Sequence, residues 1–533
     1  MRKLFFIFLI FYPVAALAQP VTQEWVATYL NPYGLGGGPR DMVIDTLGNV
    51  YLTGGILTPA EQTNNYATMK YNSSGILRWA KIYNGPGSNS VDEAIAVAVD
   101  IQGNVYVTGN SEEYGFLTDA YCTIKYDSSG NQLWVARYKN LPNGIDDPTA
   151  IAVDNQGNVY VTGSSQSILG MDYLTIKYNT DGDSLWMRRY RGPGTGNPDN
   201  YSNSLCLDNQ GNVYITGESP GINSGRQVCT IKYNTNGVQQ WVVRNDTVRS
   251  SGGYKVTVDK LTGDVYVCGY FGGGSFPQYL MVSKISSSGI NQWTKCYTGG
   301  ISETGYDIKV DNLHNIYVVG KAIFTQPSIE EDYVTIKYNS NGDTAWVRRF
   351  NLVEGSNYYP AITLDKFNDV YVEGFRLQST GYEFITLKYD IYGEQKWIMT
   401  YPGIGLKVEV DNSLNVFVSG SKSGKDYTTI KYSQPNGVTP ISGNIPTKFS
   451  LSQNHPNPFN PKSNIKFQIA KLSNVKLAVF DMLGREITTL VNQKLTPGTY
   501  EVDFDGSNYP SGVYFYKLVT EDYTEARKMV LLK

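Results

Sequence analysis

The sequence is poor in the residues that most often carry catalysis or metal binding. Its 533 residues include only two histidines and five cysteines, and charged residues make up 17% of the chain. The cysteines are odd in number and lack metal-ligand spacing, so we interpret them as small buried thiols and expect no disulfide framework. The formal net charge of −3 gives no reason to expect nucleic acid or an anionic membrane as a partner.

Long hydrophobic runs and helical periodicity are also missing beyond the first residues. The N-terminus has a positive end, an apolar stretch at 4–12 and a small-residue cleavage site before Gln19, which together predict a secretory signal peptide over 1–18. The apolar stretch is too short to span a bilayer, and no cysteine follows the cleavage site. We therefore expect an exported protein with no transmembrane segment and no lipid anchor.

Glycine and tyrosine are abundant instead, with 54 and 42 copies, and most of them belong to a repeat. The phrase Gly-Asn-Val-Tyr-Val-Thr-Gly and its variants occur eight times at a period of about 52 residues. An Asp precedes each copy, and an Ile-Lys-Tyr or close variant follows it. Every tryptophan of the chain belongs to this repeat, and these are Trp25, Trp79, Trp134, Trp186, Trp241, Trp293, Trp346 and Trp397.

Each repeat predicts four short strands separated by turn residues. A lone fourth strand at 25–29 comes first, and the last repeat stops at its third strand, 428–432, so the N-terminal strand is expected to complete the last blade. The prediction is an all-β fold with an eight-bladed β-propeller over 19–432. A seven-bladed ring with one stray repeat is the alternative.

These motifs resemble the SBBP class of secreted bacterial propeller repeats over roughly residues 25–432. The resemblance depends on Asp-x-x-Gly-Asn-Val-Tyr-Val-Thr-Gly, on Ile-Lys-Tyr and on the tryptophan. It implies a propeller and export, and it implies no shared chemistry.

Residues present in every repeat are interpreted as architecture, because a functional site normally needs one copy. The Asp-x-x-Gly-Asn stretch suits a tight turn, with a calcium loop as the alternative, and the tryptophans suit packing wedges between blades. Each lysine precedes the next tryptophan by nine residues, which allows either a cation–π contact or a lysine stem packed along the blade. We expect neither a metal nor a cofactor.

The variable connections between the second and third strands and between blades indicate where function lies. Both lie at the same end of a four-stranded meander, so one face of the ring is diversified and the other is uniform. Segments 55–65, 110–120 and 164–172 are examples of the diversified connections. The candidate binding residues on this face are Tyr114, Phe116, Asp119, Asp146, Asp147, Tyr201, Tyr270 and Phe271.

Evidence for catalysis is thin. A histidine-based site in the propeller would have to use His314, which is expected on the uniform face. The leading hypothesis is therefore a monomeric binding or scaffold module for a polysaccharide or a surface protein, and not an enzyme. The alternatives are a carboxylate-dependent glycan hydrolase or lyase, and a structural surface component that associates with itself.

The repeat ends near residue 433, where a linker composition at 433–447 precedes a small Ig-like β-sandwich predicted over 448–533. Its motifs Pro456-Asn-Pro-Phe-Asn-Pro461, Pro510-Ser-Gly-Val-Tyr-Phe-Tyr516 and the terminal Lys528-Met-Val-Leu-Leu-Lys533 resemble the type A sorting domain of the type IX secretion system. The resemblance implies the type IX secretion machinery as a partner and a secreted or outer-surface location. An ordinary Ig-like adhesive module is the alternative. The residues assigned to the sorting signal are Pro456, Asn457, Pro458, Phe459, Gly512, Tyr514, Lys528 and Lys533.

Overall fold

The fold is known from a computed structural model that describes most of the chain after the first twenty residues. The described residues are 21–59, 63–87, 90–112, 119–194, 199–222, 225–245, 249–273, 276–324, 330–351, 360–379, 381–434, 439–442, 446–495, 497–507 and 509–533. The predicted signal peptide lies outside them. The chain divides into two compact units, one over Gln23–Tyr432 and the other containing Ser433–Lys533.

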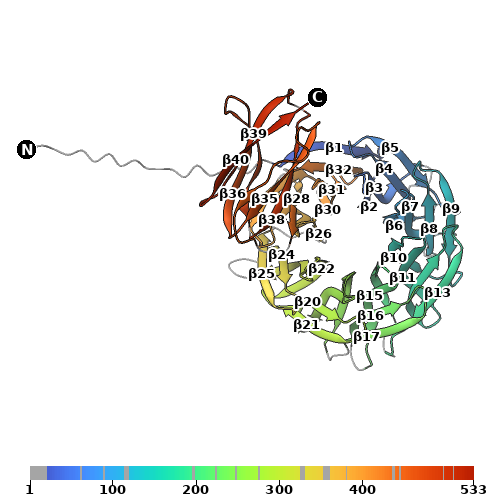
Figure 1. Ribbon diagram of the computed structural model, residues 1–533. Helices are drawn as coiled ribbons and strands as arrows, with labels where there is room; N and C mark the ends of the chain where they lie inside the picture. The colour runs from blue at the N-terminus through green and yellow to red at the C-terminus, as the bar shows by residue number, and fades with distance from the viewer. Residues whose placement is uncertain are drawn as a thin grey trace, which may run out of the picture. The chain divides into compact units, whose positions relative to one another are not determined.

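The first unit is a ring of antiparallel four-stranded meanders (Figure 1). Six of them are separate sheets: β2 (Gly37–Ile44), β3 (Val50–Leu57), β4 (Asn64–Tyr71), β5 (Leu77–Tyr83); β6 (Asp92–Val99), β7 (Val105–Glu112), β8 (Asp119–Tyr126), β9 (Gln132–Tyr138); β10 (Asp146–Val153), β11 (Val159–Ser167), β12 (Gly170–Tyr178), β13 (Ser184–Tyr190); β14 (Tyr201–Leu207), β15 (Val213–Pro220), β16 (Arg226–Tyr233), β17 (Gln239–Arg244); β26 (Ala361–Leu364), β27 (Val370–Gln378), β28 (Gly381–Tyr389), β29 (Gln395–Pro402); and β30 (Ile404–Val410), β31 (Val416–Ser421), β32 (Asp426–Ser433) with β1 (Thr22–Leu30).

Two further meanders join into one eight-stranded sheet through a single parallel pair, Gln278 opposite Ser302. Its strands are β18 (Ser251–Val258), β19 (Val265–Gly273), β20 (Phe276–Ile285), β21 (Asn291–Tyr297), β22 (Ser302–Val310), β23 (Ile316–Phe324), β24 (Glu330–Tyr338) and β25 (Thr344–Asn351). The predicted all-β propeller is confirmed, while the number of blades stays a prediction because these two meanders share a sheet.

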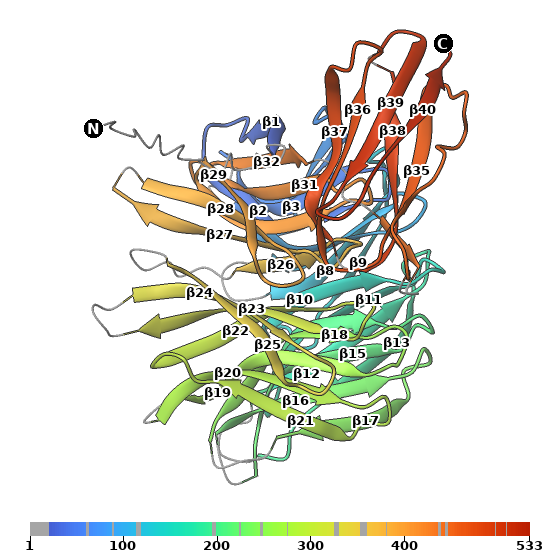
Figure 2. The same cartoon turned by 60° about the vertical axis from the view of Figure 1, so that its left-hand side comes forward.

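The N-terminal strand lies in the sheet of the last repeat. β1 is the outer strand of the order β1-β32-β31-β30, so it pairs with a strand about four hundred positions later in the chain. The first strands of the meanders, among them β2, β6, β10, β22, β26 and β30, lie on the inside of the ring (Figure 1). Successive meanders follow one another around the ring with their faces packed together (Figure 2).

The repeated aspartate organises the turn between the first and second strands. Asp154 Oδ1 accepts hydrogen bonds from the backbone nitrogens of Gln156 and Asn158, both at 2.9 Å. Its Oδ2 accepts from Asn158 Nδ2 at 2.9 Å and from the Tyr160 hydroxyl at 3.2 Å. Four donors from the same turn thus bond to this carboxylate. The contacts correspond to the tight turn that the motif predicts.

The repeated tryptophan joins each blade to the next one. Trp186 Nε1 donates to the Thr235 carbonyl at 2.9 Å, and Lys177 Nζ donates to the same oxygen at 3.2 Å. The indole covers Gly237, whose φ is +74°, and a Cβ placed on this glycine would lie 2.7 Å from the Trp186 ring. The same arrangement recurs for Trp25 over Gly75, Trp79 over Gly130, Trp134 over Gly182 and Trp346 over Gly393.

The lysine nine residues before each tryptophan has a different aromatic partner from the one considered in the sequence. Lys177 lies opposite Trp186 in the sheet, but its Nζ sits over the ring of Tyr160, 4.9 Å from the centroid. Lys125 sits over Tyr106 in the same way, at 5.2 Å. The cation–π contact therefore joins the second and third strands of one blade, while the ammonium donates to the next blade.

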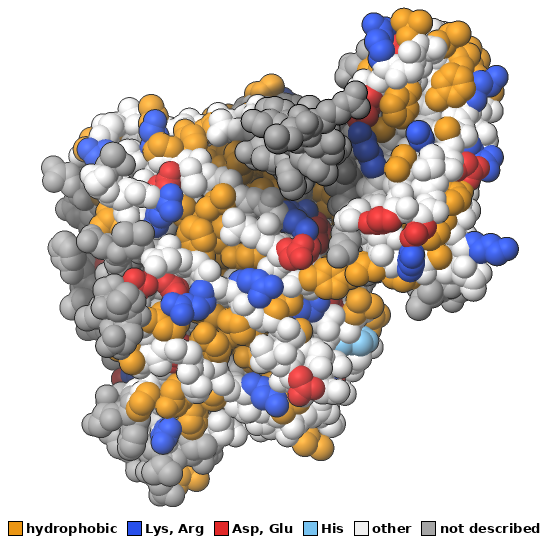
Figure 3. Space-filling model, turned by 90° about the vertical axis from the view of Figure 1, so that its left-hand side faces the viewer, with side chains coloured by type: hydrophobic (Ala, Val, Ile, Leu, Met, Phe, Trp, Pro, Cys, Tyr) orange, Lys and Arg blue, Asp and Glu red, His pale blue; other side chains and the backbone are white. Residues whose placement is uncertain are grey.

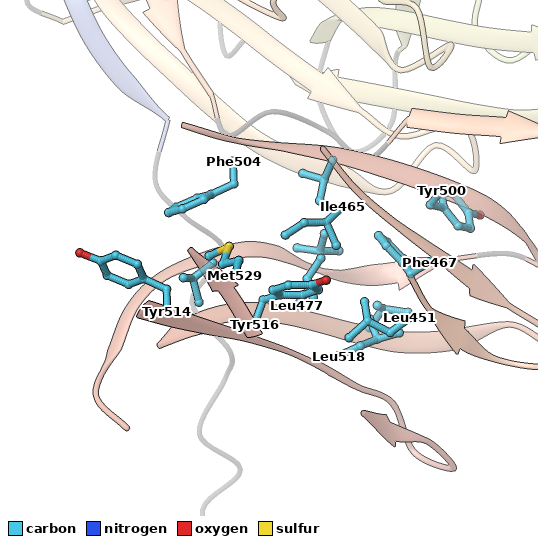
Figure 4. Close-up of a cluster of buried hydrophobic side chains, with 14 of the residues drawn as sticks. Leu451, Ile465, Phe467, Leu477, Tyr500, Phe504, Tyr514, Tyr516, Leu518 and Met529 are labelled. Carbon is cyan, nitrogen blue, oxygen red and sulfur yellow. The ribbon is translucent and has the colours of Figure 1, made fainter. Parts of the chain in front are cut away.

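The second unit is a sandwich of two four-stranded sheets. One contains β33 (Thr439–Ser442), β38 (Gly498–Asp505), β35 (Lys462–Ile469) and β34 (Ser450–Leu451), and the other contains β37 (Glu486–Leu495), β36 (Ser473–Phe480), β39 (Gly512–Val519) and β40 (Thr524–Leu531). Buried side chains including Phe467, Leu477 and Tyr516 fill the space between the sheets (Figure 4). The predicted sandwich is confirmed, although the sequence had not indicated β37.

We expect the replacement Trp186→Ala to lower the free energy of unfolding by about 3–5 kcal/mol, because it leaves a cavity at a joint between blades. Gly237→Ala keeps the tryptophan but forces a Cβ against its ring, so it is expected to lower the melting temperature as well. Thermal unfolding followed by circular dichroism measures both effects. Two variants as stable as the natural chain would show that this joint does not hold the ring together.

Candidate functional site

The candidate binding residues lie in strands and not in loops. Tyr114 and Phe116 fall outside the described residues, while the others belong to strands as follows: Asp119 to β8, Asp146 and Asp147 to β10, Tyr201 to β14, and Tyr270 and Phe271 to β19. The strands run further than expected, since β11 ends at Ser167 and β12 begins at Gly170, within the connection expected at 164–172. The pairs Tyr201 with Glu218 and Phe271 with Ser251 place these positions at the end of each sheet next to the second-to-third-strand connection.

Tyr201 and Tyr270 belong to one cluster that crosses two neighbouring blades. The Arg226 guanidinium lies over the Tyr201 ring, 4.6 Å from its centroid, and pairs with Glu218 at 3.2 Å. Burial and the Glu218 carboxylate, to which its hydroxyl donates, raise the pKa of Tyr270. The side chains of Tyr201, Arg226 and Tyr270 are partly exposed, whereas that of Glu218 is buried. The structure thus brings together two aromatic rings and an ion pair that lie far apart in the sequence.

Two more tyrosines extend this cluster toward the inside of the ring. Tyr254 contacts Tyr270 with centroids 5.7 Å apart, and it stacks on Tyr306 with centroids 5.6 Å apart and planes 4° from parallel. Sequence reasoning missed both residues because it assigned the first strands to architecture. The signal was present, since the residue five positions before the turn aspartate differs from repeat to repeat. We call Tyr201, Tyr270, Tyr254 and Tyr306 the tyrosine platform.

Asp146 has a structural role that the sequence did not indicate. It is fully buried, accepts a hydrogen bond from the Asn140 backbone nitrogen at 2.9 Å, and is bonded to the Ser165 hydroxyl. Arg189 reaches Tyr138 Oη at 2.9 Å and the Ser165 hydroxyl at 2.5 Å, which ties two blades together. Asp92 with Ser111 and Arg137 repeats this network in the preceding blade. Burial therefore places Asp146 beneath the candidate surface and not on it.

Asp119 and Asp147 take part in a group of carboxyls on two neighbouring blades. Asp147 accepts from Asn110 Nδ2 at 2.9 Å, and burial raises its pKa. Burial, followed by the charges of Asp147 and Glu112, raises the pKa of Asp119 to about 6. The remaining candidate, Phe271, is half-buried against the core around Val228.

The histidine of the propeller is part of the uniform face, as expected. His314 lies in the turn between β22 and β23 with φ +64°, where most repeats have glycine. Its Nδ1 is 2.5 Å from Asp259 Oδ2 in the turn of the neighbouring meander. Among the residues that the structure describes, no group of three or more His, Cys, Asp or Glu side chains is arranged to hold a metal ion.

The sorting motifs, which are separate in the sequence, meet at the C-terminal strand. The Phe459 backbone nitrogen donates to the Val530 carbonyl and its oxygen accepts from the Leu532 nitrogen, both at 3.0 Å. Asn457 Oδ1 accepts from the Val530 nitrogen at 2.9 Å. Pro456 and Pro458 are exposed beside them, and Phe459 is buried in the sandwich core.

The same C-terminal end of β40 also holds the remaining sorting residues. Gly512 pairs with Leu531 and Tyr514 with Met529 across β39 and β40. The Tyr514 hydroxyl donates to the Pro510 carbonyl at 2.7 Å, and Lys533 Nζ donates to the Ser507 carbonyl at 2.6 Å. Lys528 is exposed on β40. The motifs therefore form one continuous surface along the last strand.

We expect Asp119→Asn to stabilise the protein at pH 7.5 relative to the natural chain, and to leave its stability unchanged near pH 3.5. The folded pKa of Asp119, about 6, exceeds the value in an unfolded chain, so its ionisation opposes folding and stability falls as the pH rises through this interval. The expected gain is about 1 kcal/mol, because solvent screens a partly exposed carboxyl. Melting temperatures at both pH values test this, and an equal effect at both pH values would contradict it.

Comparison with known proteins identifies both units by their sequences. Residues 454–532 match the family described as the secretion system C-terminal sorting domain, and residues 78–116 and 136–170 match the β-propeller repeat family SBBP. No curated protein matches the chain. No helix of the described residues is long and apolar enough to cross a membrane.

Solved structures with a similar course of the chain have low sequence identity. PorZ, an essential bacterial surface component of the type-IX secretion system of Porphyromonas gingivalis, is 14% identical with a TM-score of 0.38, covering 91% of this chain. The present chain spans 64% of PorZ. Sqt1 from Chaetomium thermophilum is 9% identical with a TM-score of 0.49, over 77% of this chain and 99% of that one. The β-propeller domain of the Trilobed protease from Pyrococcus furiosus is 7% identical with a TM-score of 0.35, over 71% and 94%.

The family matches agree with the sheets of the first unit and with the motifs that meet along β40 in the second. The sorting domain indicates interaction with the type IX secretion machinery and export to the cell surface or beyond it. The protein is an exported β-propeller that contains SBBP repeats over 78–116 and 136–170 and a type IX C-terminal sorting domain over 454–532.

Proposed function

We propose that the exported propeller is a binding module, and that a polysaccharide or a surface protein binds the diversified face of the ring. The observation that carries the proposal is the tyrosine platform with the Arg226–Glu218 pair, which combines partly exposed aromatic rings with charged groups at 3.2 Å. Aromatic side chains with a few fixed polar groups are the usual lining of a ligand site.

The scaffold supports this use of the face. Among the described residues, seven tryptophans each pack on a turn glycine of the next blade, so the strand ends that carry the platform have little freedom to move. A rigid scaffold that presents variable positions at one end is a common arrangement for binding. Figure 3 views the molecule from the side of the ring, where basic and acidic side chains are interspersed. The small formal net charge of −3 favours local contacts over general electrostatic attraction.

We expect the full chain to be retained by a member of a panel of polysaccharides and cell-surface proteins, and Tyr270→Ala to weaken that retention about tenfold or more. Tyr270 links the two blades of the platform, so its loss removes aromatic surface and leaves Glu218 without its hydroxyl donor. Tyr392→Ala is the matched control, since Tyr392 is exposed in the strand turn between β28 and β29 at the opposite end of the ring. Affinity chromatography with melting curves for each variant measures the effect.

Equal weakening by both tyrosine variants would contradict the proposed face. Self-association of the chain without retention on any member of the panel would favour a structural surface component. The same measurement yields the oligomeric state, for which a monomer is the expectation.

A second candidate function is a glycan hydrolase or lyase that uses the carboxyls at the strand ends of this face. The raised pKa of Asp119, about 6, beside Glu112 and Asp147 is the property expected of a general acid. Shortening of a retained polysaccharide that Asp119→Asn abolishes would establish this activity. Retention without shortening would leave binding as the function.

A further inference from the structure

The first strands of the meanders carry a second variable set of residues, which face the inside of the ring. Four positions before the turn aspartate, successive repeats have Asp41, Ala96, Ala150, Ser204, Lys255, Asp307, Ala361 and Lys407. Two positions before it, Lys309 and Glu409 add two more charges. These positions alternate with buried apolar ones such as Val256 and Ile308. Because they change from repeat to repeat, they are not part of the common architecture.

The charges on these strands converge from several blades, including the two that meet where the ring closes. Lys407 of β30 pairs with Asp41 of β2 at 3.2 Å. Burial lowers the pKa of Lys255 in β18, and the like charges of Lys407 and Lys309 add to this effect. Lys255 interacts electrostatically with charged side chains of β22, β30 and β2. The charged side chains of these four strands therefore extend into one common space. We call Asp41, Lys255, Asp307, Lys309, Lys407 and Glu409 the inner charge cluster.

In the described part of the chain, two carboxylates of this cluster, Asp41 and Asp307, have hydrogen-bond or ion-pair partners that Lys255 and Lys309 do not have. Asp307 Oδ1 accepts from the Ile308 nitrogen at 2.9 Å and its Oδ2 from the Ile362 nitrogen at 3.1 Å. Asp41 holds Lys407 and also accepts from the Val97 nitrogen at 3.1 Å.

The lysines have fewer partners within the same cluster. Burial raises the pKa of Glu409, and the charges of Lys309 and Lys407 oppose this shift. Neither Lys255 nor Lys309 forms an ion pair or a hydrogen bond with a residue that the structure describes. Lys309 and Lys255 both help to lower the pKa of Asp307, so nearby carboxyls offset part of the lysine charge. An ammonium group that loses hydration without gaining a hydrogen bond is still unfavourable.

Two tyrosines of the platform lie in the same strands as these lysines, Tyr254 next to Lys255 and Tyr306 three residues before Lys309. A β-bulge between Gly253 and Lys255 inserts Tyr254 as an extra residue, and a bulge between Gly305 and Asp307 does the same for Tyr306. Bulges re-aim the side chains next to them. Tyr254 precedes Lys255 in the chain, so the stacked rings and the ammonium groups belong to one stretch of the inner strands.

We propose that this inner stretch binds an acidic polysaccharide, with a carboxylate or sulfate group of the glycan accepting hydrogen bonds from Lys255 and Lys309 while a sugar ring lies against Tyr254 and Tyr306. The inference rests on the proposed binding function and names its ligand class. An anionic group supplies the hydrogen-bond acceptor that the two ammonium groups lack among the described residues, and charge-assisted hydrogen bonds of this kind are the strong ones. The apolar face of a pyranose ring gains by burial against the tyrosines.

The experiment measures retention of the full chain on immobilised polygalacturonate, dextran sulfate and neutral dextran. Lys255→Met and Lys309→Met remove one charge each while keeping an apolar stem of similar length. Lys260→Met is the matched control, because Lys260 is exposed in the turn that follows β18. Using two variants keeps the test informative if one of them fails to fold, which melting curves reveal.

The expected result is retention on one or both acidic polymers and not on dextran, weakened about tenfold or more by either inner variant and unchanged by Lys260→Met. Retention is also expected to fall as sodium chloride is added. Preference for one acidic polymer identifies the anionic group as carboxylate or sulfate, and either outcome supports the proposal.

Four results would overturn the inference. Equal retention on dextran and on the acidic polymers, or wild-type retention by both inner variants, would exclude the lysines as the anion site. If Tyr270→Ala still weakens retention in those cases, the proposed binding function stands without this ligand class. Retention on a protein but on none of the polymers would likewise leave only the binding function, whereas no retention on any ligand would contradict both.

Discussion

The contact between a tryptophan of one blade and a turn glycine of the next is the constraint on which the propeller depends. The Trp186 indole leaves no room for a Cβ at Gly237. The Thr235 carbonyl of the same turn accepts hydrogen bonds from both Trp186 and Lys177. Trp25 on β1 makes the same contact with Gly75. The joint that stacks blades along the chain therefore also closes the ring, which leaves no open sheet edge at that place.

Because these joints repeat, the positions that do not repeat become informative. Asp146 was a plausible surface acid in the sequence, yet its burial with Ser165 and Asn140 makes it part of a network between blades. Tyr254 and Lys255 lie on a strand that appeared to be architecture, yet they vary from repeat to repeat and remain partly exposed. Function in a repeat protein is thus better located by comparing equivalent positions than by separating loops from strands.

In the sorting domain, by contrast, the sequence motifs already identify the residues of interest. Its motifs could be recognised in the sequence, and the structure explains why they occur together, because Asn457 and Phe459 bond to the last strand that carries Lys528. Burial of Phe459 and Tyr514 in the core ties this surface to the stability of the sandwich. The family match over 454–532 covers all of these motifs.

The sequence by itself determined the strands, the turns and the export of this protein, because those features depend on neighbouring residues and on short motifs. The turn at Asp154 is an example, since every group that bonds to this carboxylate in its own turn lies within six residues. Only the tertiary structure decided that Glu218 meets Tyr270 of the next blade, or that Lys255 and Lys407 share one space. Such contacts depend on the curvature of the whole ring and on the bulges of its inner strands, and no local pattern encodes which distant blades face each other.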